Sequence, residues 1–117
     1  MSEDWARPVV RWEIQAKDPQ KIREFYSRMF NWDIDDGQLM QIPPGIGGPE
    51  PAPGGHILPS DTSRVVLYIQ VRDLRESLDR AASLGGTATR EPFNIPGGPT
   101  IAGIADPEGN PVVLVQQ

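Results

Sequence analysis

The sequence predicts an α+β protein built from two β-α-β-β-β modules. Residues 10–18 recur as residues 65–73 at an offset of 55 positions, with a valine, an isoleucine, a glutamine and an aspartate repeated in register. In each copy a run rich in β-branched residues ends at the aspartate, and a helical pattern follows. The 117 residues suit one domain. We therefore expect a single domain over residues 1–117, with modules at about 7–60 and 63–116.

The first helix is expected directly after the first strand, which ends at Asp18. Asp18 is a suitable N-cap, and Pro19 at the first helical position loses no hydrogen bond. Asn31 can end the helix in the left-handed conformation. Five apolar residues in between follow helical spacing and are expected to face the core: Ile22, Phe25, Tyr26, Met29 and Phe30.

The strands of the first module are expected at Trp32–Ile34, at Leu39–Ile42 and, as a third candidate, at His56–Leu58. The 17 residues Pro43–Pro59 contain 11 glycines or prolines, which predicts a loop inside the module. Two interpretations of this loop stay open. It is either a solvated connection or a flap that closes over a site.

The second module repeats the order with clearer boundaries. Its helix is expected to begin at Asp73, with Glu76 placed as in a capping box, and to end at Gly85–Gly86. Strands are expected at 87–89, 100–104 and 111–115, with the turn formers of residues 106–111 joining the last two.

Composition excludes several classes of function. The chain has no cysteine and one histidine, which excludes disulfide frameworks, thiolate nucleophiles, zinc ribbons and sites with two imidazoles from one chain. A formal net charge of −5 argues against binding to nucleic acid or to an anionic membrane surface. The first residues do not form a signal peptide, and no apolar run could span a membrane. We expect a cytoplasmic protein.

The module order, together with three sequence motifs, resembles the vicinal oxygen chelate superfamily, also called the glyoxalase/bleomycin-resistance/dioxygenase group. The motifs are residues 25–32 (FYSRMFNW), 84–86 (LGG) and 106–110 (DPEGN). The resemblance implies two modules whose sheets curve into a cup around a cleft, usually within a homodimer. Metal-dependent members hold a divalent ion there with four side chains, one from the first and one from the last strand of each module. Fold alone does not fix function.

The implied metal positions carry few suitable ligands in this chain. They fall on Arg11 and Val66 in the first strands, near His56 in the last strand of module one, and on Val113 in the last strand of module two. A protonated guanidinium cannot ligate, and valine has no donor atom. A catalytic zinc-type site needs at least three protein ligands. We therefore expect no metal and no cofactor.

Strand alternation divides the side chains between the two faces. If Arg11 faces the cup, then Val9 and Glu13 face it too, while Val10, Trp12 and Ile14 pack on the helix side. In module two, Val65, Leu67, Ile69 and Val71 are expected in the core, and Val115 joins the cup. The predicted ligand-binding residues are Arg11, Glu13, His56, Val66, Tyr68, Gln70 and Val113.

Arg11 is the central candidate, because a guanidinium matches a carboxylate or two neighbouring oxygens. In one interpretation Arg11 replaces the metal as the positive group; in the other it only pairs with Glu13. Glu13 and Tyr68 are the weaker catalytic candidates, for acid–base work. His56 is either an exposed loop residue or a proton donor that closes over the ligand.

The sequence thus favours a metal-free protein that binds a small organic ligand in the cup, with Arg11 in place of the metal. The alternative is a metal-dependent lyase, isomerase or dioxygenase with a rearranged site. The sequence leaves open whether the protein is an enzyme. We expect a homodimer, because cups of this superfamily often complete their site across a two-fold axis.

Overall fold

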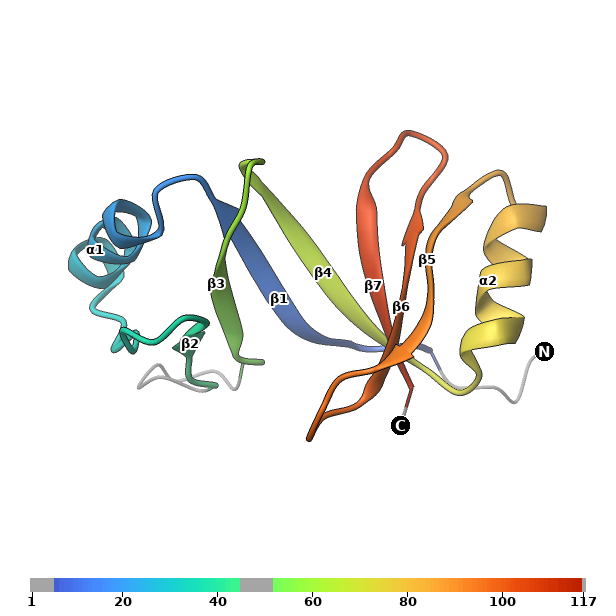
Figure 1. Cartoon of the computed structure of the whole chain (residues 1–117), viewed down its shortest axis with the longest axis horizontal. Coiled ribbons are helices and arrows are strands. Elements are labelled where there is room, and N and C mark those ends of the chain that lie inside the picture. The colour runs from blue at the N-terminus through green and yellow to red at the C-terminus, as the bar shows by residue number, and fades with distance from the viewer. Residues whose placement is uncertain (1–5, 45–51, 117) are drawn as a thin grey trace. The chain divides into compact units, whose positions relative to one another are not determined.

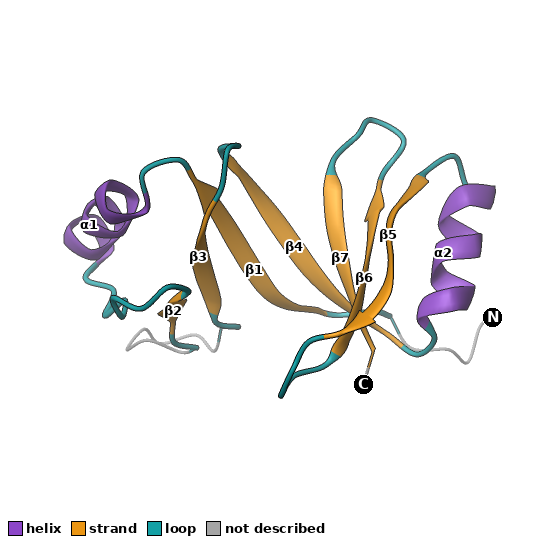
Figure 2. Ribbon diagram, viewed as in Figure 1, coloured by secondary structure: helices purple, strands orange, loops and turns teal. Residues whose placement is uncertain are grey.

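The computed structural model describes residues 6–44 and 52–116. This part of the chain contains seven strands and two helices, which confirms the α+β class (Figures 1 and 2). The strands are β1 (Val9–Ala16), β2 (Met40–Ile42), β3 (Gly55–Pro59), β4 (Arg64–Val71), β5 (Thr87–Asn94), β6 (Thr100–Ala105) and β7 (Pro111–Gln116). The helices are α1 (Pro19–Phe30) and α2 (Leu74–Ser83).

The chain divides into two compact units. The α1 unit is Arg11–Val66, and the α2 unit combines the chain up to Val10 with the chain from Leu67 onwards. The division cuts through β1 and β4, so neither unit coincides with one sequence repeat. That the two repeats make a single domain stays a prediction.

The α1 unit places three strands in the order β2-β3-β1 and packs α1 on one face. β3 is parallel to β1 and antiparallel to β2, so that Ile14, Ile57 and Met40 lie in one row across the strands. All three are buried, with Ile34 and Ile42, under the helix side chains Ile22 and Tyr26. This row is the hydrophobic core of the unit.

The caps of α1 are those that the sequence predicts. The Asp18 carboxylate accepts a hydrogen bond from the Lys21 amide at 3.2 Å, and Asn31 ends the helix with φ of 61°. The predicted core stripe is wrong for three of its five members, since Phe25, Met29 and Phe30 are more than half exposed. Only Ile22 and Tyr26, one turn apart, meet the core. Trp32 stacks on Tyr26 with centroids 5.5 Å apart and covers the end of the helix.

The strand expected at Trp32–Ile34 is not formed. Ile34 is buried in the core, but its carbonyl accepts hydrogen bonds from Nε and Nη2 of Arg23 at 2.9 and 2.7 Å. The Arg23 Nε also reaches the Asp35 carbonyl at 3.0 Å. A side chain of α1 therefore satisfies the carbonyls that a neighbouring strand would otherwise engage.

The predicted loop Pro43–Pro59 is wrong at its C-terminal end. Gly55–Pro59 is the strand β3, which includes the third candidate His56–Leu58. Gly55 can lie opposite Trp12 because it has no side chain: a Cβ there would be 2.6 Å from the Trp12 ring and 2.7 Å from its carbonyl oxygen. Residues 45–51 of the predicted loop lie outside the described residues, so a closing flap stays a prediction.

The strands of the α2 unit follow the order β4-β7-β6-β5, and the helix and strands expected for the second module are all formed. β4 and β7 are parallel, and the pairs β7·β6 and β6·β5 are antiparallel. α2 begins at the Asp73 cap, whose carboxylate accepts from the Glu76 amide at 3.0 Å, and Gly85 follows it with φ of 94°. The core consists of Val71, Leu74, Leu78, Ala102 and Leu114.

The face assignment of β4 is only partly right. Val71 is buried as expected, whereas Val65 is 59% and Leu67 is 42% exposed. The core of the α2 unit begins only near the end of β4, where Leu74 of α2 follows.

Among the described residues, no helix is long and apolar enough to cross a membrane.

Candidate functional site

A polar row crosses the three strands of the α1 unit on the face opposite α1. The register places Gln41 of β2 beside His56 of β3, and His56 beside Glu13 of β1. Residues on either side of this row in sequence, such as Ile14 and Ile57, face the core, so alternation directs the row to the other face. Glu13 and His56 are each only 4% exposed.

His56 bridges Arg11 and Glu13. The Arg11 Nε–H donates to His56 Nδ1 at 2.8 Å, and His56 Nε2 lies 2.7 Å from Glu13 Oε1. Arginine has only donors, so Nδ1 must present its lone pair. Nδ1 of the imidazole therefore carries no hydrogen. The ring carries its hydrogen on Nε2 and donates it to the Glu13 carboxylate.

Arg11 makes its other contacts to neutral acceptors. Its Nη2 donates to the Gln41 side-chain oxygen and, at 3.3 Å, to the carbonyl of Gly55. Within the described part of the chain, Nη1 has no hydrogen-bond partner. The Arg11 residue is half-buried, and among the described residues its charge meets no carboxylate directly.

Gln15 extends the network along β1. Its Nε2 donates to Glu13 Oε2 at 2.8 Å, while its oxygen accepts from Arg64 Nε at 2.8 Å and from the Thr62 hydroxyl at 2.5 Å. Both oxygens of Glu13 thus have donors. The cluster Arg11–His56–Glu13–Gln15, here called the Arg11 cluster, fixes each of its side chains through the next one.

The Arg11 cluster corrects two interpretations from the sequence. Arg11 and Glu13 do not form the direct pair that their spacing allows, because the imidazole of His56 lies between them. His56 is neither an exposed loop residue nor a donor on a closing loop, since it is buried in β3. The sequence misses Gln15 and Gln41 as members of the site. Gln41 can be identified as a member of the site only from the pairing of β2 with β3, which no local sequence pattern predicts.

Most of the predicted site residues of module two belong to the α2 unit, whereas the Arg11 cluster belongs to the α1 unit. Tyr68 of β4 pairs with Val113 of β7, and Gln70 pairs with Val115, all in the α2 unit. Leu114 and Val71 belong to the core beside α2, so Tyr68, Gln70 and Val113 lie on the opposite face by alternation. Val66 belongs to the α1 unit and is 2% exposed.

The donor set does not fit the divalent ion that the resemblance implies. In register, the first-strand partner of His56 is Glu13 and that of Val113 is Tyr68, which moves the expected first-strand positions by two residues from Arg11 and Val66. Both nitrogens of His56 are already hydrogen-bonded within the cluster, and Val113 offers no donor atom. Among residues 6–44 and 52–116, no group of three or more His, Asp or Glu side chains is arranged for a metal.

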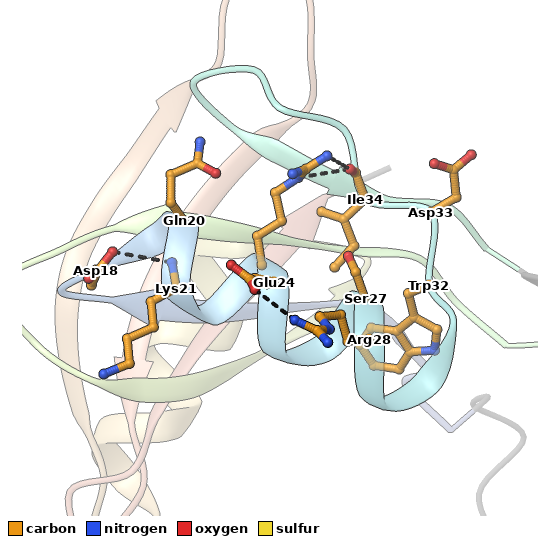
Figure 3. Close-up of a pocket in the computed structure, with 10 residues that line it drawn as sticks. Asp18, Gln20, Lys21, Glu24, Ser27, Arg28, Trp32, Asp33 and Ile34 are labelled. Carbon is orange, nitrogen blue, oxygen red and sulfur yellow. Dashed lines mark hydrogen bonds and ion pairs between the residues drawn. The ribbon is translucent and has the colours of Figure 1, made fainter.

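A groove of about 720 Å³ runs along α1 and contains none of the predicted site residues (Figure 3). Its charges are mixed: Arg28 is paired with Glu24 at 3.2 Å, and Lys21 and Asp33 also line it. Figure 3 shows the Asp18 cap at its wall, and the Arg23 side chain, which donates to the Ile34 carbonyl, also lines the groove. Asp18 caps the helix here, and Arg23 holds the turn that follows it.

Comparison with known proteins decides the family. A sequence model of the glyoxalase-like domain matches residues 11–115. The chain belongs to the glyoxalase-like domain family. The resemblance inferred from its motifs is therefore confirmed, and so is the fold of that superfamily. A search of curated protein sequences gives no match.

Solved structures of this superfamily share the fold at low sequence identity. A glyoxalase/bleomycin resistance protein/dioxygenase superfamily member from Vibrio splendidus 12B01 matches with a TM-score of 0.66 and 13% identity, over 96% of this chain and 100% of that one. The methylmalonyl-CoA epimerase of Streptomyces coelicolor matches with a TM-score of 0.63 and 15% identity, over 93% of each chain. A Mn(II)-bound glyoxalase from Novosphingobium aromaticivorans matches with a TM-score of 0.61 and 17% identity, over 95% of this chain and 40% of that one.

Proposed function

We propose that this glyoxalase-like chain binds a small organic anion at Arg11 without a metal ion. One observation carries the proposal: the Arg11 guanidinium is held by three neutral acceptors, while Nη1 has no partner in the described part of the chain. Two N–H groups and a positive charge are therefore left for a ligand. A carboxylate or a pair of neighbouring oxygens suits them.

The cluster supports this role because it holds the guanidinium before a ligand arrives. Arg11 is anchored at Nε by His56 and at Nη2 by Gln41 and Gly55, so its free edge has a fixed direction. A group that is ordered in advance loses less conformational entropy on binding. Tyr68, Gln70, Val66 and Val113 stay ligand-binding residues predicted from the sequence.

A carboxylate panel that includes methylmalonyl-CoA is the first test. Several structural neighbours are methylmalonyl-CoA epimerases, and this thioester carries a free carboxylate. Titration calorimetry should show binding that Arg11→Ala weakens by about 10–100-fold, since hydrogen bonds to charged groups contribute about 1.5–3 kcal/mol. Arg11→Lys should also weaken binding, because lysine cannot reproduce the planar fork.

Arg28→Ala is the matched control. Arg28 lies on α1, is highly exposed and pairs with Glu24. Its loss changes the net charge as Arg11→Ala does but leaves the cluster intact. Equal affinities for wild type, Arg11→Ala and Arg28→Ala would contradict the proposal.

A second candidate is metal-independent proton transfer by Glu13, with Tyr68 as a further acid–base group. The buried Glu13–His56 contact of 2.7 Å favours it, because a carboxylate beside an imidazole is a common acid–base arrangement. The test is exchange of the C2 hydrogen of methylmalonyl-CoA with deuterated water, followed by NMR. Exchange that is lost in Glu13→Gln would establish this candidate.

Oligomeric state and location belong to the same proposal. We infer a cytoplasmic homodimer, supported by the cysteine-free composition and by the exposed apolar side chains of Val65 and Leu67. Light scattering at micromolar concentration should give twice the mass of one chain. A monomer there would contradict the dimer.

A further inference from the structure

We propose that His56 is the positioning residue of Arg11. Its Nδ1 lone pair holds the guanidinium in the orientation that leaves Nη1 for an anionic ligand. This inference rests on the proposed function, in which Arg11 binds the ligand. His56 itself acts only through Arg11.

The surroundings of His56 fix its ring and its tautomer. The residue lies in the middle strand of the row Gln41–His56–Glu13 and is 4% exposed. The Glu13 carboxylate accepts the Nε2 hydrogen at 2.7 Å, and Gln15 holds Glu13 from its other side at 2.8 Å. A carboxylate at Nε2 favours the tautomer whose Nδ1 is an acceptor. Glu13 thus determines what His56 can offer to Arg11.

Arg11 depends on that acceptor for its orientation. An arginine side chain carries about 2 kcal/mol of rotamer entropy, which must be offset for the guanidinium to keep one position. The 2.8 Å contact engages Nε and leaves the two outer nitrogens to the other partners. Without it, Gln41 and the Gly55 carbonyl contact only Nη2, and the plane of the guanidinium can rotate.

Two substitutions of His56 separate positioning from packing. In His56→Asn the amide oxygen takes the place of Nδ1, so it can still accept from Arg11, while the link to Glu13 is lost. In His56→Gln the amide nitrogen takes the place of Nε2, so the link to Glu13 is kept and the acceptor for Arg11 is lost. Each variant keeps either the contact to Arg11 or the contact to Glu13.

Affinity for methylmalonyl-CoA, measured by calorimetry, should follow the Arg11 contact. We expect His56→Asn to stay within about threefold of wild type and His56→Gln to bind at least about tenfold more weakly. Both variants leave a buried group short of a partner, so both should lower the melting temperature. If affinity instead followed the melting temperature, or fell equally in both variants, His56 would be structural only and the inference would be overturned.

A spectroscopic measurement tests the same contact without any ligand. The chain has one histidine, so a long-range proton–nitrogen NMR correlation on labelled protein contains the signals of His56 alone. We expect hydrogen on Nε2, none on Nδ1, and a scalar coupling across the hydrogen bond between Nδ1 and the Arg11 Nε. His56→Asn should keep the Arg11 Nε–H signal protected from exchange with water, and His56→Gln should lose that protection.

The two measurements fail in distinguishable ways. Hydrogen on Nδ1, or no coupling to Arg11, overturns the positioning inference whatever the protein binds. The expected coupling together with no binding of any panel anion supports the geometry of His56 and Arg11 but overturns the proposed function.

Discussion

The two units of this chain present the same strand pair with opposite chemistry. In the α1 unit, parallel β1 and β3 place Glu13 beside His56; in the α2 unit, parallel β4 and β7 place Tyr68 beside Val113. The repeat offset of 55 residues carries Glu13 onto Tyr68. Polar partners therefore stand in one copy where an aromatic and an aliphatic residue stand in the other.

This difference shows that the paired polar side chains are concentrated in the α1 unit. Both units keep apolar side chains beneath their helix, Ile14 with Ile57 in one and Ala102 with Leu114 in the other. The face opposite the helix is the one that differs, because the fold does not constrain it. The Arg11 cluster belongs to one repeat, so each of its properties should change when that repeat is altered and persist when the other is.

The largest effect is expected from the cores, which the two units share. Ile57→Ala and Leu114→Ala should each lower the free energy of unfolding by about 2–5 kcal/mol, since both remove buried side chains from a packed row. Chemical denaturation measures this directly. A loss below about 1 kcal/mol in only one of the two variants would show that the units are not packed alike.

Gly55→Ala should come next, by about 1–3 kcal/mol, because the new Cβ would lie 2.6 Å from the Trp12 ring. The displaced ring would also disturb the pairing of β3 with β1, on which the Arg11 cluster depends. Gly37→Ala is the control, since its Cβ would have no contact closer than 3.7 Å. Equal melting temperatures for the two variants would contradict this account of the β1–β3 contact.

Glu13→Gln should cost about 1–3 kcal/mol of stability. The carboxylate accepts from both His56 and Gln15, whereas the amide offers one oxygen for two donors and leaves a buried donor unpaired. Glu24→Gln removes a carboxylate from the exposed pair on α1 and should change stability by less than about 1 kcal/mol. Denaturation curves that do not separate these variants would argue against a tightly bonded cluster.

The smallest effect is expected in the turn between β6 and β7. Hydrogen bonds, first of all from the Asn110 side chain, hold the pKa of Asp106 below its usual value of 3.8. Because the pKa is lowered on folding, the contribution to stability is complete above pH 3.8 and is lost as the pH falls through the folded pKa. Asn110→Ala should therefore raise the pKa of Asp106 in an NMR titration. An unchanged value would remove the Asn110 hydrogen bond as its main cause.

The features that the sequence predicts well are those set by local contacts. Asp18 and Asp73 cap the helices as expected, and residues 106–110 form the expected turn. Each depends on residues within four positions. The module order and the three sequence motifs also predict the correct family.

The features that it misses depend on residues far apart in the chain. The burial of His56 follows from pairing with Glu13, 43 positions away, and the coil at Trp32–Ile34 follows from the Arg23 side chain, 11 positions from Ile34. Alternation places Arg11 and Glu13 on one face but does not show that an imidazole lies between them. The long-range pairing of β3 with β1 assembles the Arg11 cluster. This strand is hard to predict because it ends a segment rich in glycine and proline.

We propose Arg11, rather than a metal ion, as the positive centre of the site. Its most direct test is the metal content of untagged protein after incubation with Mn²⁺, Ni²⁺ or Zn²⁺ and removal of the unbound ion, measured by inductively coupled plasma mass spectrometry. We expect well under one ion for every ten chains, since both nitrogens of His56 are hydrogen-bonded and Val113 has no ligand atom. About one ion per chain would contradict it, and would return Lewis-acid catalysis to the leading place.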